Sequence, residues 1–225
     1  MRSNSSLIGH LIGSHPEING YYEIQQDYLT NSDFLLQKIK YAMANNVKPN
    51  SRFFFDKLLH NGVNVDCDLM IKRNAIVFIS LRDVNATIPS IVKLAKREKW
   101  REQSEEYATR YLSKRLDDLA HYARQLKGKY AYFDADLLRE SSEETLNFIA
   151  NVVGLETPIP SEYNVQSLTG IGGAGDTSDA IRSGKIIPNK SISKGNAFVS
   201  DLEIQDKFND VRALLINNSH SSLTS

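Results

Sequence analysis

A small polar turn at residues 2–6 is the first stretch that could do chemistry, because it precedes apolar residues with helical spacing at 7–12. Such a turn presents backbone N–H groups and the positive end of the helix dipole to an anion. Arg2 adds a charge, and Asn4 tolerates a left-handed backbone better than other non-glycine residues. The turn therefore predicts an anion site, and the alternative is a serine-rich terminus that frays.

A second anion site is predicted around Arg82, which directly follows the most apolar segment of the chain, residues 75–81. This segment has the composition of a parallel strand covered on both faces. Ser90 comes eight residues after Arg82, about two turns into the helix expected next. An Arg at a strand end and a hydroxyl on the following helix can bind one phosphate together. The alternative is a surface ion pair of Arg82 with Asp83 or Glu98.

Two further stretches carry groups that could neutralise charge or move a proton. Lys57 and His60 follow an apolar run at 53–55, which predicts a short buried strand. A Lys there can neutralise charge on a bridging phosphate oxygen, and a His can act as a base. Glu23 suits a site near an anion if it takes a proton from a substrate. The alternatives are a loop histidine with ordinary partners and a surface glutamate.

Glycine is concentrated at residues 170–176, a segment followed by Ser178, Arg182 and Lys185. Glycines in this number suit close approach of the backbone to a ligand, although a flexible hinge explains them equally well. The pattern G-x-x-x-x-G-K-[ST] does not occur in the sequence, which argues against an ordinary ATP or GTP phosphate loop.

The composition restricts the class of protein. The 225 residues carry 27 basic and 27 acidic side chains, so the formal net charge is zero. Wide nucleic-acid or membrane-surface binding usually needs a basic excess, so we expect no nucleic-acid partner and a local site for any anionic ligand. The single cysteine, Cys67, excludes an internal disulfide and a cysteine-rich metal site. No transmembrane run or signal peptide is found, and a cytoplasmic location is expected.

Strands alternate with helices along the chain, which predicts an α/β fold with one central parallel sheet flanked by helices. Ligands bind beyond the carboxyl ends of such strands, where the loops after residues 55, 81 and 133 would converge. We expect one domain at 1–216, with a long ordered loop at 157–194, and a disordered polar tail at 217–225. The main expected helices are 31–46, 84–97, 102–126, 141–153 and 200–215, and the expected strands are 53–55, 75–81 and 130–133.

The helix expected at 31–46 has an apolar face. Phe34, Leu35, Ile39 and Met43 share that face, and Ser32 is the expected N-cap.

Together the motifs resemble those of sulfotransferases that use 3′-phosphoadenosine 5′-phosphosulfate (PAPS). Residues 2–7 (RSNSSL) are similar to the family's 5′-phosphosulfate loop, roughly P-[RK]-[ST]-G-[ST]-[ST]-L, with Asn4 where glycine is usual. Residues 15–17 (HPE) match an element that often ends the next helix. Residues 76–83 resemble the 3′-phosphate signature, a strand followed by R-D, with Ser90 at the matching distance.

Two more elements extend the resemblance to about residues 1–156. Residues 56–61 (DKLLHN) are similar to the family's "d-K-x-x-x-n" element, and residues 130–155 resemble its strand, capped helix and Gly-Leu stretch.

The resemblance implies a P-loop-like sulfotransferase fold and in-line transfer of a sulfuryl group from PAPS, without a metal, to a hydroxyl or amine. The acceptor would be a small molecule, a sugar or a lipid, and the oligomeric state is left open. Arg82 and Ser90 would bind the 3′-phosphate, and Arg2 and Lys57 would also stabilise charge during transfer. The residues implied for the 5′ side are Arg2, Ser3, Asn4, Ser5, Ser6 and Leu7.

The resemblance also ranks the candidate bases. Tyrosylprotein sulfotransferases place a catalytic Glu shortly after H-P-D and a catalytic Lys before the R-D strand, and Glu23 and Lys57 occupy the matching positions. The cytosolic branch uses a His, to which His60 is the nearest counterpart. We therefore rank Glu23 first as the base and His60 second.

The chain begins directly before the phosphosulfate loop, so the family's first strand is expected to be missing. The alternative function is a degenerate, non-catalytic nucleotide- or partner-binding module of the same fold. A kinase-like phosphotransferase is disfavoured, since it needs a Gly-Lys-Ser/Thr loop.

Overall fold

The computed structural model describes residues 3–171, 176, 178–188 and 202–225, and these form two compact units. Unit 1 contains residue 3, Ala75–Asp136 and residues 202–225. Unit 2 contains Asn4–Asn74 and, in its described part, Leu137–Pro188. Each unit combines helices with parallel strands, so the α/β prediction is confirmed.

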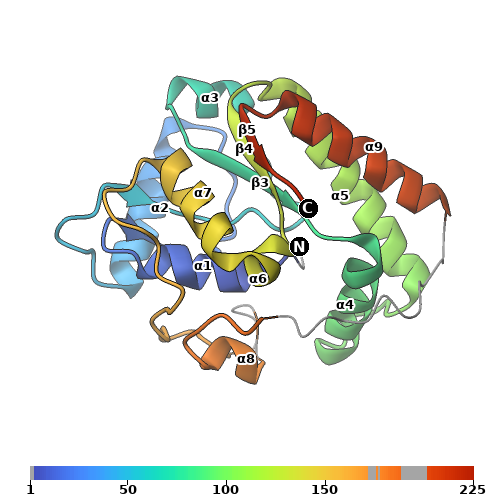
Figure 1. Cartoon of the computed structure of the whole chain (residues 1–225), viewed down its shortest axis with the longest axis horizontal. Helices are drawn as coiled ribbons and strands as arrows, with labels where there is room; N and C mark the ends of the chain where they lie inside the picture. The colour runs from blue at the N-terminus through green and yellow to red at the C-terminus, as the bar shows by residue number, and fades with distance from the viewer. Residues whose placement is uncertain (1–2, 172–175, 177, 189–201) are drawn as a thin grey trace. The chain divides into compact units, whose positions relative to one another are not determined.

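Unit 1 is built on a three-stranded parallel sheet in the order β3-β4-β5 (Figure 1). The strands are β3 (Val77–Leu81), β4 (Tyr130–Asp134) and β5 (Ser221–Leu223). Val77 pairs with Tyr130, and Ala131 with Ser221. The middle strand β4 is buried along its whole length, which explains why its sequence is apolar rather than alternating.

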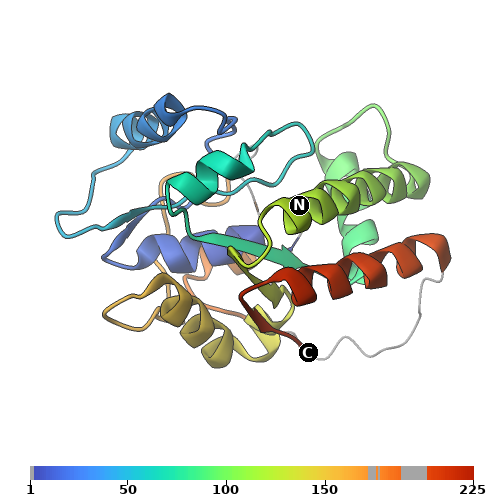
Figure 2. The same ribbon diagram turned by 90° about the horizontal axis from the view of Figure 1, so that it is seen from above.

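The described part of unit 1 also contains three helices: α4 (Val84–Arg97), α5 (Glu105–Gln125) and α9 (Leu202–Asn218). Helices α5 and α9 lie side by side (Figure 2). Ser104 caps α5 by accepting a hydrogen bond from the backbone N–H of Tyr107. Helix α4 has the predicted bounds and runs through Pro89 without interruption.

The C-terminal residues correct one prediction. Residues 217–225, expected to be disordered, end α9 and form β5. The backbone N–H of His220 donates to the carbonyl of Tyr130 (2.9 Å), and that of Ser225 donates to the Asp134 carboxylate (3.0 Å). The prediction was wrong because polar composition does not reveal that these residues complete one side of β4.

Unit 2 contains a two-stranded parallel sheet and six helices among its described residues. Strands β1 (Ile18–Asn19) and β2 (Phe53–Phe54) pair in register, with Ile18 opposite Phe53. The one central sheet that we expected is therefore, in the described residues, two sheets, one in each unit. The helices are α1 (Ser5–Ser14), α2 (Asn31–Ala44), α3 (Cys67–Lys72), α6 (Leu137–Glu140), α7 (Ser142–Val153) and α8 (Asp179–Arg182).

Helix α2 differs from its prediction in both its cap and its orientation. The N-cap is Thr30 instead of Ser32, and the Asp33 carboxylate accepts a hydrogen bond from the Thr30 backbone N–H (2.7 Å). The buried residues of α2 are Gln37 and Tyr41, whereas most of the predicted apolar face is exposed.

Candidate functional site

Glu23 and His60, predicted as alternative bases, lie in contact within unit 2. Nε2 of His60 is 3.3 Å from Oε2 of Glu23. The Glu23 side chain is 15% exposed and that of His60 is 42% exposed. The carboxylate is therefore mostly buried while the imidazole remains accessible, and the two candidates form one acid–base pair.

Lys57 is buried beside helix α1, with 7% of its surface exposed. A Cβ placed on Gly9 would lie 3.2 Å from Nζ of Lys57 and 2.6 Å from the carbonyl oxygen of Tyr21. A Cβ on Gly13, one turn further along the same face, would clash with the carbonyl of Gly20. These two glycines therefore allow the amine of Lys57 and the chain at 20–21 to lie directly on α1.

Glu23 and Lys57 each stabilise the charged form of the other. Burial would raise the pKa of Glu23, but the hydrogen bond from His60 and the positive charge of Lys57 hold it below its ordinary value. Burial lowers the pKa of Lys57, and the carboxylates of Glu23 and Asp56 oppose that shift. Glu23 is therefore a carboxylate at neutral pH.

Asp56 fixes the relative position of the segments that carry these groups. Its Oδ1 accepts hydrogen bonds from the backbone N–H of Ile24 (3.0 Å) and of Lys57 (2.7 Å). Its Oδ2 accepts a hydrogen bond from the hydroxyl of Tyr28 (2.7 Å). Asp56 was not predicted as a positioning residue, although its place between β2 and Lys57 was a signal.

The turn before α1 has the left-handed backbone conformation that the asparagine at position 4 suggested. Asn4 is the N-cap residue and has a left-handed conformation, with φ 56° and ψ 21°. This conformation explains how asparagine replaces the glycine that is usual in the similar loop. The first turn of α1 carries no acidic side chain. Arg2 lies outside the described residues.

The other predicted residues of this loop have mixed environments. Ser5 begins α1 and is half-buried, and Oγ of Ser6 accepts a hydrogen bond from the backbone N–H of Asp176 (3.1 Å). Leu7 is a core residue, 3% exposed. A cation that we did not predict, Arg139, donates from Nε to Oδ1 of Asn4 (3.2 Å).

Of the glycine cluster, Gly170 is described, while Gly172, Gly173, Ala174 and Gly175 lie outside the described residues. Gly170 has φ +76°, and its carbonyl accepts a hydrogen bond from Nη2 of Arg182 (3.1 Å). A side chain on Gly170 would clash with that guanidinium. Glycine at this position therefore accommodates Arg182.

Helix α1 also contacts Thr169 through His10. Nδ1 of His10 donates to the carbonyl of Ser6 (2.7 Å), so Nε2 accepts from the hydroxyl of Thr169 (2.7 Å). Burial lowers the pKa of His10, which favours this neutral form.

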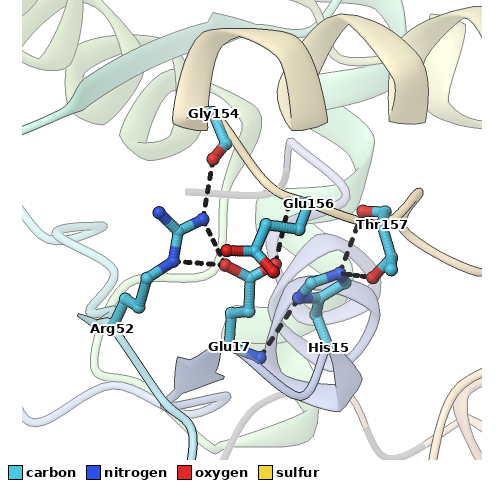
Figure 3. Close-up of polar contacts among 6 residues, drawn as sticks. All are labelled: His15, Glu17, Arg52, Gly154, Glu156 and Thr157. Atoms are coloured by element: carbon cyan, nitrogen blue, oxygen red, sulfur yellow. Dashed lines mark hydrogen bonds and ion pairs between the residues drawn. The ribbon is translucent and has the colours of Figure 1, made fainter.

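The His-Pro-Glu element forms a structural cluster (Figure 3). Nε2 of His15 donates to the carbonyl of Thr157 (3.0 Å), and its Nδ1 accepts from the backbone N–H of Glu17 (3.3 Å). Glu17 forms an ion pair with Arg52 and accepts from the backbone N–H of Glu156 (2.9 Å). These contacts join the end of α1 to β2 and to the turn after α7, and His15 is fully buried.

In unit 1, Arg82 follows β3 as predicted, and it forms an ion pair with a carboxylate that the ion-pair alternative did not name. Nε of Arg82 lies 3.0 Å from Oδ1 of Asp136. Asp83 instead caps α4, and Glu98 pairs with its neighbour Arg97. Ser90 lies half-buried in α4.

The described part of the chain lacks both a metal-ligand cluster and a membrane-spanning helix. No group of three or more His, Cys, Asp or Glu side chains there is arranged to hold a metal ion. No helix there has the length and apolar character needed to cross a bilayer.

Comparison with known proteins supports the fold. No protein-family model matches the chain, and no curated protein matches its sequence. A similar solved structure is the sulfotransferase domain from the curacin biosynthetic pathway, with a TM-score of 0.58, 11% sequence identity and 94% of each chain covered. At this identity the similarity shows that the chain has a sulfotransferase-like α/β fold.

Proposed function

We propose that this chain is a sulfotransferase that moves a sulfuryl group from PAPS to a hydroxyl, or an amine, of a small-molecule, sugar or lipid acceptor. The observation that carries the proposal is the Glu23–His60 pair in the unit that also buries Lys57 against α1. The similarity to a solved sulfotransferase domain supports it at the level of fold.

The surroundings of α1 fit an anionic donor. Its first turn has no acidic side chain, its N-cap residue Asn4 is left-handed, and the amine of Lys57 lies one turn into the helix, beside Gly9. We propose that residues 2–7 bind the 5′ side of PAPS and that Arg82 and Ser90 bind a 3′-phosphate, as the resemblance implies. PAPS supplies the sulfuryl group, and 3′-phosphoadenosine 5′-phosphate (PAP) is the second product.

Glu23, Lys57 and His60 of unit 2 can each take one role in the reaction. Glu23 takes the proton of the acceptor hydroxyl as the acceptor oxygen bonds to sulfur, and the bond between sulfur and the bridging phosphate oxygen breaks. Lys57 stabilises the negative charge that develops on that bridging oxygen. His60 orients the Glu23 carboxylate through its Nε2–H. Most of the rate enhancement would come from positioning and from charge stabilisation.

The test has a binding arm and a transfer arm. PAP at 100 times its dissociation constant should raise the free energy of unfolding by about 2.7 kcal/mol, whereas ATP should have a much smaller effect. Equal thermal shifts with PAP and ATP would exclude the proposed donor. Transfer is measured with sulfur-labelled PAPS and a panel of phenols, sugars and lipid alcohols. Stabilisation by PAP without transfer to any acceptor would favour the non-catalytic nucleotide-binding alternative.

A further inference from the structure

Helix α2 presents an apolar face to solvent. The two residues that it buries are Gln37 and Tyr41, one of them polar. The exposed apolar residues are Leu35 (59% exposed), Leu36 (41%), Ile39 (46%) and Met43 (83%). This arrangement is the reverse of that in a helix that packs on a core, where the apolar face points inward.

Specific contacts hold α2 in this orientation. Tyr41 packs edge-to-face on Phe54 of β2, with ring centroids 5.8 Å apart. Near the start of the helix, Phe34 lies 5.3 Å from the ring of Tyr28 and beneath the guanidinium of Arg73. Because these contacts lie along most of the helix, it cannot turn its apolar residues inward without losing them.

The charges on α2 border the apolar face on both sides. At about 100° per residue, Leu35, Met43 and Leu36 lie within roughly 60° of Ile39, while Lys38 and Lys40 lie about 100° to either side. The acidic residue of α2, Asp33, is turned to the helix start, where it accepts hydrogen bonds from the backbone N–H groups of Leu29 (2.9 Å) and Thr30 (2.7 Å). Nζ of Lys38 lies 5.6 Å from the ring centroid of Phe54, and Lys40 is half-buried. The outward side is therefore apolar at its centre, with one lysine at each edge.

We propose that α2 docks this protein on the surface of an anionic phospholipid bilayer. A helix that lies in a bilayer interface places apolar residues at the acyl boundary and lysines at its polar edges. Lysine stems can lie along the apolar layer while their ammonium groups reach the lipid phosphates. The zero net charge of the whole chain is compatible with such a site, because the attraction is local to α2.

The size of the face argues against a second copy of the chain as its occupant. A stable protein interface buries about 800 Å² on each partner and uses about 20–30 residues a side. The exposed apolar face of α2 consists of four side chains on a helix of 14 residues. Insertion into a bilayer needs only one face of one helix and gives reversible binding. Docking is independent of the proposed transfer chemistry, and its test measures binding alone.

The test is cosedimentation of the full chain with vesicles of phosphatidylcholine and phosphatidylglycerol, and with vesicles of phosphatidylcholine alone. The wild type should bind the anionic vesicles more tightly, and added salt should weaken that binding. The triple variant Leu35→Gln, Ile39→Gln, Met43→Gln should bind at least about tenfold less. Glutamine is a good helix former and the three sites are exposed, so its thermal unfolding should match the wild type.

Matched variants separate the two parts of the face. Replacing Lys38 and Lys40 by Gln should weaken binding to the anionic vesicles by about fivefold per lysine and leave binding to neutral vesicles unchanged. The control for charge is the exposed pair Lys127→Gln and Lys129→Gln, which should bind like the wild type. The control for apolar surface is the exposed set Val165→Gln, Ile171→Gln and Ile187→Gln, which should also bind like the wild type.

Several outcomes would overturn the proposal. One is failure of the wild type to bind either kind of vesicle at low salt. Another is a triple variant that binds as tightly as the wild type. A third is a concentration-dependent dimer in sedimentation velocity that the triple variant abolishes, without vesicle binding, which would assign the face to a second copy.

Discussion

Replacing Glu23 by Gln is the most direct test of the proposed base. Gln has nearly the same shape and can keep a hydrogen bond to His60, but it cannot accept the proton of the acceptor. General-base catalysis contributes about 10²–10⁴-fold, so turnover should fall by that factor, which corresponds to about 2.7–5.5 kcal/mol. The dissociation constant of PAP should change little, because the proposed 3′-phosphate ligands, Arg82 and Ser90, are untouched.

The pH dependence of turnover tests the role of His60. The pKa of Glu23 is held below its ordinary value, so the active carboxylate form should persist on the acid side of the usual glutamate range. Replacing His60 by Ala removes a hydrogen bond and a charge that lower this pKa. The pKa of Glu23 should then rise, and the acid limb of the pH–rate profile should move to higher pH while the enzyme stays active.

The assay is steady-state turnover of wild type, Glu23→Gln and His60→Ala with one acceptor across pH, alongside calorimetric PAP dissociation constants. Glu144→Gln is the matched control, since Glu144 is an exposed glutamate on α7 and should keep wild-type turnover. An inactive His60→Ala with an active Glu23→Gln would reverse the roles.

Three further changes test other parts of the structure. Arg82→Ala should weaken PAP binding by about 1.5–3 kcal/mol in a calorimetric titration; unchanged affinity would make Arg82 a structural partner of Asp136. Asp56→Asn should lower kcat with little change in the PAP dissociation constant, because Asn has one acceptor oxygen for three donors; equal kcat values would refute its positioning role. Lys48→Met should lower the free energy of unfolding by at least about 2 kcal/mol in a urea titration, since Lys48 donates to the backbone carbonyls of Gly13, His15 and Ile18, which lie between the last turn of α1 and β1. Burial lowers the pKa of Lys48 from 10.5 in the unfolded chain to about 8 in the folded protein. Between these two values the unfolded chain binds more protons than the folded one. The free energy of unfolding of the wild type, relative to that of Lys48→Met, should therefore rise as the pH increases from about 8 to 10.5.

Helix and strand positions were predictable wherever the signal was local. Helix α4 has the predicted bounds because Asp83 is a good N-cap and apolar residues recur at helical spacing after it. Helix α7 ends where Gly154 takes a left-handed backbone, φ 71°, as glycine after a helix predicts. Asn4 likewise has the left-handed backbone that its residue type suggested.

The features that sequence reasoning missed depend on contacts between distant segments. The orientation of α2 is fixed by Tyr41 on Phe54 and by Arg73 on Phe34, and no periodicity within the helix reveals either contact. Strand β5 forms because it completes one side of β4, which lies about 90 residues earlier. The pairing of Arg82 with Asp136 similarly depends on the parallel register of β3 and β4.

The parallel register of β1 and β2 explains why Glu23 and His60, predicted as alternative bases, lie in contact. Ile18 lies opposite Phe53, 35 residues further along the chain. Continued beyond the strands, this offset places Glu23 level with residue 58, between Lys57 and His60. The Glu17–Arg52 ion pair joins the residues just before the two strands, and Asp56 joins the segments just after them (Figure 3 shows the first contact). The His-Pro-Glu element thus acts on the candidate site through the register that it helps to fix, so replacing Glu17 should disturb Glu23 and Lys57 together.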